Sequence, residues 1–541
     1  MGERRRLGVQ DALWLEMDRP SNLMVVDSVV WTATPIDWER FRAVARERLW
    51  DRYRVFRSVV VHGDDGAWYW EERPGIDLDS HLQHLVLPAP GDDEVLQAFI
   101  GSQRTVPLDR DRPLWQMYCI DNYKGASAVV IRTHHAIADG IRMVQLAMSL
   151  FDASAEGGAI LAPAVHLHGE RTATAGSSTD RPTRSGVASV TRELVDLTGE
   201  AARRVGDAVA DTVIDPIGVT AERLGALGQA VGHAAASAAS ASLGLATTAV
   251  TNPVGAAHSA ATMAAAAAET TAAWWRAAMQ PRLPGEGPLV DFFSAAPGDV
   301  DIARKLLIGT RNDTTIWSGA VGSEKAVAWS APLPLAEVKT VARATGATVN
   351  DVLVTCVAGT LHAYLDHHGA HCGSVNLMIP VNLKPLDLAL PEELGNSFAI
   401  VQLELPTNVG DPLAVLDVVR RRMGRIKNGH EAAVAFRIQE IISGLSKTAY
   451  QASVDLLANR ALGVLTNVPG PPMPVYLAGE KVDGMVGWAP LSGNQPMCFT
   501  IYSYDGKVFV GIACDVGLVP DHHQIVDGFA AAFERLAAAT H

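Results

Sequence analysis

Hydrophobic and polar positions follow two different periods along this chain, and the change of period marks its most informative stretch. Residues 128–131 form a short apolar run, Ala-Val-Val-Ile, of the kind that predicts a buried strand. Between 141 and 151, apolar residues recur at three- and four-residue spacing, which predicts a helix whose first turn is opened by Gly140. The junction between strand and helix reads Arg-Thr-His-His-Ala-Ile-Ala-Asp-Gly over residues 132–140.

Two imidazoles, a carboxylate and a glycine gather at this junction, at His134, His135, Asp139 and Gly140. A histidine at a strand end can face a cleft while a rigid sheet holds it, and its near-neutral pKa suits it to take and return a proton. We therefore interpret the junction as an active site. In the alternative interpretation, Asp139 is the N-cap of the helix and both histidines are hydrogen-bonded polar residues at a strand end.

The same patterns predict further elements on both sides of the junction. An amphipathic helix is expected over residues 37–49, and a final helix over about 525–538. Two hairpins are expected, one joining 59–61 to 67–70 and one joining 497–504 to 508–514. Thr348 is a candidate cap for a helix whose apolar face includes Val352, Cys356 and Leu361.

The composition changes after the junction helix. Small and polar residues fill 153–184, and no Asp, Glu, Lys or Arg stands between Arg223 and Glu269. Ala, Ser, Gly and Thr predominate there, so the segment is too weakly apolar to be interpreted as a transmembrane helix. Three interpretations stay open: helical packing between domains, a flexible linker, or a helix that rests on a membrane or lipid droplet with residues 274–275, Trp-Trp, as an anchor.

Bulk properties narrow the class of protein. A length of 541 residues predicts two or three domains. The net charge of −14 argues against a nucleic-acid partner, which would require a basic surface. The five cysteines lack CxxC spacing, so spacing predicts neither a zinc site nor a disulfide framework, and a cytoplasmic location fits. The basic N-terminus is not followed by an apolar core, so no secretory signal is expected.

The pattern His134-His135-x-x-x-Asp139-Gly140 resembles the HHxxxDG motif of the chloramphenicol acetyltransferase and condensation-domain superfamily. More narrowly, the chain resembles bacterial wax ester synthase/diacylglycerol acyltransferases, because further segments similar to that family follow in the same order. These segments are 11–20, Asp-Leu-Asp-Ser-His at 77–81, Pro-Leu-Trp at 113–115, Asn350-Asp351, Leu-Gly-Asn at 394–396 and Asn-Val-Pro-Gly-Pro at 467–471.

The resemblance implies an α/β (α+β) fold of two chloramphenicol acetyltransferase-like domains with mixed sheets and an active-site tunnel between them. The expected boundaries are 1–170 for the N-terminal acyltransferase domain with HHxxxDG, 171–300 for an Ala-rich helical linker, and 301–541 for the C-terminal acyltransferase-like domain. Opposed tunnel entrances would let an acyl-CoA and a lipid hydroxyl meet at His135.

The resemblance also implies transfer of an acyl group from long-chain acyl-CoA to diacylglycerol, with long-chain alcohols as further acceptors. His135 would be the general base and His134 its support, while Asp139 would order the motif and Gly140 leave room for a chain or a pantetheine arm. Acyl-CoA would be a co-substrate, and neither a cofactor nor a metal would be needed. Peripheral contact with a membrane or lipid inclusion is a separate expectation.

Several alternatives remain at this point. Asn350 and Asp351 either form a polar bridge that steadies the substrate channel or serve the helix start, where a carboxylate complements the helix dipole; we favour the structural role. Trp115 is expected to anchor the core and Arg112 to pair with a carboxylate. Acylation of another hydroxyl or amine, and lipid binding without turnover, are the competing functions.

Overall fold

The computed structural model describes residues 4–158, 313–382, 394, 396, 398–428 and 461–540, with scattered positions between 431 and 460. The chain divides into two units, of which the first comprises Met1–Val165, Asn312–Gly429 and Ala461–His541. The second comprises His166–Arg311 and His430–Arg460. Nearly all described residues belong to the first unit, and the Ala-rich segment with its three interpretations lies outside them.

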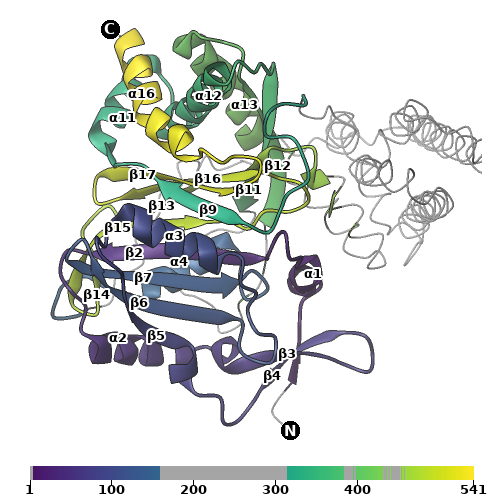
Figure 1. The fold of residues 1–541 in the computed structure, drawn as a ribbon, viewed down its shortest axis with the longest axis vertical. Helices are drawn as coiled ribbons and strands as arrows, with labels where there is room; N and C mark the ends of the chain where they lie inside the picture. The colour runs from purple at the N-terminus through teal and green to yellow at the C-terminus, as the bar shows by residue number, and fades with distance from the viewer. Residues whose placement is uncertain are drawn as a thin grey trace, which may run out of the picture. The chain divides into compact units, whose positions relative to one another are not determined.

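A seven-stranded mixed sheet carries the histidine junction, in the strand order β5-β6-β7-β2-β15-β14-β8 (Figure 1). Its strands are β5 Leu82–Val86, β6 Trp115–Tyr123, β7 Ala126–His134, β2 Val25–Thr32, β15 Glu480–Trp488, β14 Tyr476–Leu477 and β8 Phe151–Asp152. Only β5 and β6 pair in parallel within it. Strand β7 confirms the strand expected from the apolar run at 128–131.

The helices of this half confirm most of the predicted pattern. They are α1 Val9–Met17, α2 Trp38–Ala45, which continues into η1 Arg46–Trp50, α3 Asp93–Gln103 and α4 Gly140–Ser149, with the short turns η2 Arg54–Arg57 and η3 Leu78–Ser80. The junction helix α4 is shorter than predicted. Phe151, expected at its end, instead begins β8, where it pairs with Leu477.

A three-stranded sheet of order β1-β4-β3 contains the first predicted hairpin. Its strands are β1 Arg4–Arg6, β3 Ser58–His62 and β4 Trp68–Glu72, and β3 and β4 pair antiparallel as expected.

A second seven-stranded sheet has the order β10-β17-β16-β13-β11-β12, with β9 also paired to β17. Its strands are β9 Lys325–Trp329, β10 Leu333–Pro334, β11 Ser374–Asn382, β12 Phe398–Pro406, β13 Gly463–Pro469, β16 Met497–Tyr504 and β17 Lys507–Asp515. The second predicted hairpin is confirmed in β16 and β17, whose turn residues Asp505 and Gly506 both have positive φ. The Asn-Val-Pro-Gly-Pro segment differs from a simple turn, because residues 467–469 complete β13 and pair with β16.

Among the described residues, four helices belong to this sheet: α11 Leu335–Thr345, α12 Val349–His367, α13 Pro412–Asn428 and α16 His523–Ala539. They gather on one side of it in Figure 1, and α12 packs against the other three. The apolar positions predicted for α12, Val352, Cys356 and Leu361, are all buried. Two mixed sheets with flanking helices confirm the predicted α/β class, while the tunnel stays a prediction.

Aromatic side chains join the two sheets. Trp31 of β2 stacks on Trp329 of β9 at 5.9 Å and meets Phe509 of β17 edge-on at 5.4 Å. Strands β14 and β15 come from the C-terminal part of the chain but pair into the sheet of the N-terminal strands, an exchange that the sequence patterns did not predict. Gly484 of β15 permits this packing, since a Cβ there would overlap the Trp31 indole and lie 2.9 Å from Phe509 Cζ.

No single helix of the described residues is long and apolar enough to cross a membrane. Helices α11 and α12 meet the criteria of length and composition only when taken together, and they are bent by 99° at their junction.

Candidate active site

The backbone of the histidine junction is held by two neighbouring strands. The N–H of His134 donates to the carbonyl of Leu114, just before β6, at 2.9 Å. The N–H of His135 donates to the carbonyl of Met24, just before β2, at 2.8 Å. Both histidines are therefore fixed to the ends of adjacent strands, as the sequence predicted for His134 and His135.

Asp139 is the N-cap of α4. It is 5% exposed, and its Oδ1 accepts a hydrogen bond from the backbone N–H of Arg142 at 2.9 Å. Such a cap satisfies a helix-terminal N–H that would otherwise lack a partner and fixes the direction in which the helix leaves the strand. At Gly140 a Cβ would meet no atom of the described residues within 4 Å, so the space beside the junction is open.

His134 is 1% exposed and uses both ring nitrogens. Its Nδ1 accepts a hydrogen bond from the N–H of Ala136 at 3.1 Å, so the proton of the neutral ring resides on Nε2. That Nε2 donates to Asp18 Oδ2 at 3.1 Å. His134 is thus a fixed link between the junction and the residue that follows α1.

Asp18 ties three segments together. Its Oδ1 accepts from the N–H of Met24 at 2.7 Å, while Oδ2 accepts from Arg110 at 3.2 Å as well as from His134. Burial alone would raise the pKa of the Asp18 carboxyl, but the bonds from His134, Met24 and Arg110 outweigh burial and lower it. The carboxylate is therefore ionised at neutral pH.

His135 is the junction histidine whose ring contacts aromatic side chains. Its ring stacks on the indole of Trp14 with centroids 4.0 Å apart and lies 5.8 Å from the ring of Phe398, the first residue of β12. The Nδ1 atom is buried and has no hydrogen-bonding partner of good geometry among the described residues. Burial lowers the pKa of His135 to about 4, and polar contacts with its own backbone and with Asn396 offset only part of that effect. At neutral pH the imidazole is uncharged and able to accept a proton.

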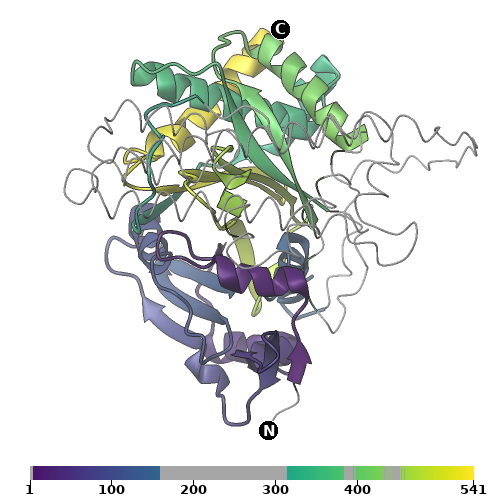
Figure 2. The ribbon, with the colours of Figure 1, turned by 90° about the vertical axis from the view of Figure 1, so that its right-hand side faces the viewer.

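Asn396 connects α1 to the junction from the other half of the unit. Its Nδ2 donates to the carbonyl of His135 at 3.0 Å and to Asp11 Oδ1 at 2.8 Å, and its backbone N–H donates to the same Oδ1 at 3.0 Å. Burial raises the pKa of Asp11, with the bonds from Asn396 acting in the opposite direction. Figures 1 and 2 show α1, which carries Asp11 and Trp14, at the level where the two sheets face each other.

Asn350 and Asp351 lie at the start of α12. Asp351 forms a capping box with Thr348, in which Asp351 Oδ2 accepts from the Thr348 N–H at 2.9 Å and the Asp351 N–H donates to Thr348 Oγ1 at 3.2 Å. Asn350 Oδ1 accepts from Asn467 Nδ2 at 2.7 Å, which links two segments of the motif set. Among the described residues, neither side chain hydrogen-bonds to the histidine motif. These contacts agree with the favoured structural role.

Trp115 is a core residue, as expected. It is 1% exposed, donates from Nε1 to the carbonyl of Phe56 at 3.0 Å, and stacks on His81 at 4.8 Å. His81 in turn contacts the Trp115 carbonyl through Nδ1 at 2.9 Å. The segment at 77–81 and the Pro-Leu-Trp element therefore support β6 next to the junction. Arg112 pairs with a carboxylate, as expected: its Nε lies 3.7 Å from Asp109 Oδ2, and both side chains are exposed.

The predicted site residues do not include Asp11, Trp14, Asp18, Asn396 or Phe398, which lie around the histidines. The first four lie in the segments 11–20 and 394–396, which resemble the family, and Phe398 begins β12. A role at the histidines could not be inferred from either segment alone, because the contacts join residues 116 and 261 positions apart.

Two family models together match most of the chain. The wax ester synthase/diacylglycerol acyltransferase catalytic domain matches residues 7–353, and the WS/DGAT C-terminal domain matches residues 394–537. The chain belongs to the wax ester synthase/diacylglycerol acyltransferase family. The histidine junction and the segment from Asp11 to Asp18 both lie inside the catalytic-domain match.

Individual relatives agree with the family. A Mycobacterium tuberculosis H37Rv protein named as a diacylglycerol O-acyltransferase is 26% identical over 99% of this chain and 97% of its own length. A second M. tuberculosis H37Rv protein of the same name is 24% identical over 97% of this chain and 93% of its own. The solved wax ester synthase/diacylglycerol acyltransferase of Marinobacter aquaeolei VT8 superposes with a TM-score of 0.57 at 16% identity, covering 99% of this chain and 100% of that one, which shows a shared fold.

Proposed function

We propose that this member of the family transfers the acyl group of a long-chain acyl-CoA to the free hydroxyl of diacylglycerol, and that long-chain alcohols are a second class of acceptor. The observation that carries the proposal is the state of His135, an uncharged imidazole that is held at a strand end beside the aromatic rings of Trp14 and Phe398. Membership of the family supports the acyl donor and the class of acceptor.

In the proposed reaction, His135 is the general base. Because its Nδ1 is buried, the acceptor hydroxyl approaches Nε2, which must carry a free electron pair while the proton of the ring resides on Nδ1. As Nε2 takes the hydroxyl proton, the oxygen attacks the thioester carbonyl. The tetrahedral intermediate then collapses, the carbon–sulfur bond breaks, and the proton passes from Nε2 to the departing CoA thiolate.

This scheme uses positioning and proton transfer, so it requires neither an acyl-enzyme nor a cofactor. Asn396 restrains the His135 backbone through its bond to the carbonyl at 3.0 Å, and Trp14 restrains the ring. Asp139 and His134 act one step further away by fixing the helix start and the strand end. Gly140 leaves open space in which an acyl chain or a pantetheine arm fits.

The low pKa of His135 matches the environment of a lipid reaction. A charged imidazolium could not accept the hydroxyl proton, and burial of the ring disfavours that charged form. The same apolar surroundings suit the chains of both substrates. Exclusion of water by these chains would also protect the thioester from hydrolysis.

The experiment that tests the function is an acceptor comparison with product identification. Purified protein is incubated with palmitoyl-CoA and diacylglycerol, hexadecanol or no acceptor, and the lipids are separated and identified by mass. Diacylglycerol should give triacylglycerol and hexadecanol should give wax ester, each with one equivalent of free CoA. Without an acceptor, little CoA should be released. CoA release without either ester would point to another hydroxyl or amine acceptor, and tight lipid binding without any release would favour a non-catalytic relative.

We also propose peripheral contact with a lipid surface, because both acceptors partition into membranes or lipid droplets. The sequence offers the charge-free segment between Arg223 and Glu269, followed by the Trp-Trp pair, which lies outside the described residues. Deletion of residues 223–275 should abolish co-flotation with phosphatidylcholine vesicles that contain diacylglycerol. Unchanged flotation would count against this proposal.

A further inference from the structure

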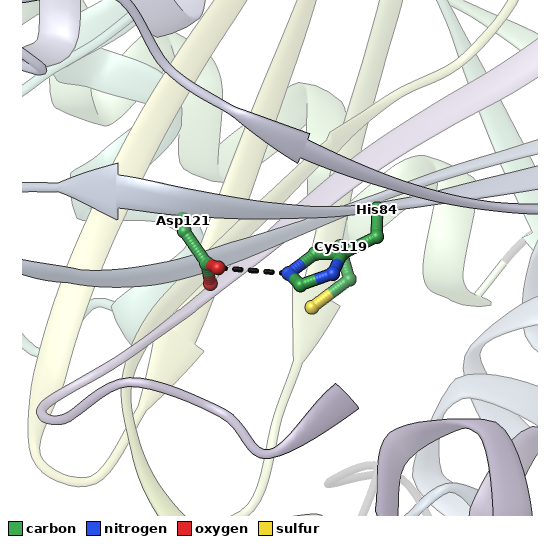
Figure 3. A group of neighbouring side chains, drawn as sticks. All are labelled: His84, Cys119 and Asp121. Atoms are coloured by element: carbon green, nitrogen blue, oxygen red, sulfur yellow. Dashed lines mark hydrogen bonds and ion pairs between the residues drawn. The ribbon is translucent and has the colours of Figure 1, made fainter. Parts of the chain in front are cut away.

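Outside the histidine junction, strands β5 and β6 bring three metal-ligating side chains to one place. His84, Cys119 and Asp121 each offer one ligand atom, and these atoms lie within 4.8 Å of one another (Figure 3). The parallel register pairs His84 directly with Cys119, and Asp121 lies two positions further along β6, so all three side chains emerge on the same face of the sheet. We propose that His84, Cys119 and Asp121 form a Zn²⁺ site that joins the edge strand β5 to β6.

Two of the three ligands are already oriented by neighbouring groups. His84 Nε2 lies 2.7 Å from Asp121 Oδ2, and its ring stacks almost parallel on Trp38 at 4.9 Å. Asp121 Oδ1 accepts a bond from Ser127 Oγ at 2.9 Å, and Ser127 is fully buried. Partners of this kind hold metal ligands in place and tune their basicity. Small side-chain rotations would bring the three atoms to the separations of about 3.5 Å that a tetrahedral zinc site requires.

The donor set selects the ion. A thiolate and an imidazole favour Zn²⁺ over Mg²⁺ and Ca²⁺, which prefer oxygen ligands only. One thiolate and one carboxylate also neutralise the double charge of the ion, so the occupied site carries no net charge. The side chains of His84 and Asp121 are 39% and 33% exposed, which leaves a solvent-facing position for a water molecule as fourth ligand.

Cys119, the third ligand, is fully buried. It binds Zn²⁺ as a thiolate, so its thiol proton is released when the ion binds.

The site goes beyond the acyl-transfer reaction, because it lies on strands β5 and β6, whereas His135 follows β7. Binding of the ion would stabilise the sheet rather than take part in the reaction. Within the described part of the chain, strand β5 is the edge of the sheet and pairs only with β6, which in turn pairs with β7, the strand that ends at His134. An ion that binds only the folded state raises the stability of that state.

The test uses the untagged full chain, stripped of metal and titrated with Co²⁺, which reports thiolate ligands by an intense near-ultraviolet absorption. The wild-type protein should bind one equivalent with that absorption, and Zn²⁺ should displace it while Mg²⁺ should not. Cys119→Ser should lose the absorption, and His84→Ala should weaken binding at least tenfold. The control His62→Ala, an exposed histidine on the β3–β4 hairpin, should bind as wild type.

A second variant and a second measurement guard against a failure of Cys119→Ser to fold. Asp121→Asn keeps the size of the side chain and should also weaken Co²⁺ binding at least tenfold. Zn²⁺ should raise the melting temperature of the wild type and of His62→Ala but not that of Asp121→Asn. An absorption that survives in Cys119→Ser, or binding unchanged in both His84→Ala and Asp121→Asn, would overturn the proposal, as would the absence of saturable binding by the wild type.

Discussion

The side chain of His135 is prepared for proton transfer by its surroundings rather than by a charged partner. Burial beside Trp14 and Phe398 disfavours the imidazolium and lowers the pKa of His135 to about 4. His134, although adjacent, is used differently, because both of its ring nitrogens are engaged in hydrogen bonds. The two histidines of one motif are thus separated into a proposed base and a structural link.

The acidic limb of the activity profile should report the pKa of His135. The neutral form is required, so kcat/KM should remain level from neutral pH downwards and fall only as the pH approaches about 4, well below the ordinary histidine value of 6.5. CoA release measured between pH 4 and 8 checks this. The unfolded chain binds this proton at higher pH than the folded protein does, so the free energy of unfolding also falls as the pH is lowered from 6.5 to about 4. Samples returned to neutral pH must therefore regain full activity.

Removal of the Trp14 ring should alter both rate and pH dependence. In Trp14→Ala the imidazole is exposed to water and less restrained, so kcat should fall by about tenfold to a hundredfold. The acidic limb should move upwards towards 6.5, the ordinary value of histidine. Trp14→Phe, which keeps an aromatic face, should retain most of the rate and the low limb. A lower rate with an unmoved limb would show that Trp14 serves packing alone.

The positions of the central site residues could be predicted from the sequence, because these residues lie close together along the chain. Strand, turn and helix cap follow one another within residues 126–149, so periodicity and residue type were sufficient to place His134, His135 and Asp139. Trp14 and Asn396 reach the same place through the fold and are separated from it by many residues. No periodicity in the sequence encodes such contacts.

Helix α1 and Asp18, the residue that follows it, connect three parts of the candidate active site to one another. Asp11 binds Asn396, Trp14 covers His135, and Asp18 binds His134, so successive turns of one short segment contact three parts of the site. The N-cap residue of the helix is Gly8, which has no side chain to accept a hydrogen bond from the first turn. Tertiary contacts rather than intrinsic propensity therefore hold it in place.

Replacement of Asp18 by asparagine should loosen this element. Both Asp18 oxygens accept hydrogen bonds, so the amide NH₂ of Asp18→Asn would face a donor, at a cost of about 1–3 kcal/mol in the free energy of unfolding. The folded-state pKa of Asp18 is lowered, so this contribution is present above the ordinary value of 3.8 and is lost only as the pH falls through the folded value. Urea unfolding at pH 7 measures it.

The matched control for this substitution is Asp64→Asn at the exposed tip of the β3–β4 hairpin. It should change the free energy of unfolding by less than about 0.5 kcal/mol. Equal effects of the two substitutions would remove Asp18 from its proposed role as a link.

For the whole described unit, the exchange of β14 and β15 determines how the two halves are held together. Strand β15 pairs with β2 in one sheet and packs on β16 and β17 of the other. The local pattern could predict that 480–488 is apolar but not which sheet it joins, because partner choice depends on contacts more than 400 positions away. The ligands of the proposed zinc site were missed for a related reason, since they come from two strands without CxxC spacing.

A single methyl group added at Gly484 should weaken the packing between the two sheets. Gly484→Ala would place a Cβ against the Trp31 indole and Phe509 Cζ, both in the aromatic cluster between the sheets, and should lower the free energy of unfolding by about 1–3 kcal/mol. Gly410→Ala is the control, because a Cβ there meets no atom of the described residues within 4 Å. Thermal melts of both variants check the comparison, and equal melting temperatures would contradict the packing account.

The central claim is that His135 accepts the proton of the acyl acceptor. The most direct measurement is free CoA released from palmitoyl-CoA in the presence of diacylglycerol, by wild type, His135→Ala and the surface control His62→Ala at equal folded concentration. We predict that His62→Ala matches the wild type and that His135→Ala loses at least about a hundredfold in rate with an unchanged melting temperature. Acceptor-dependent release by His135→Ala at the wild-type rate would contradict the account.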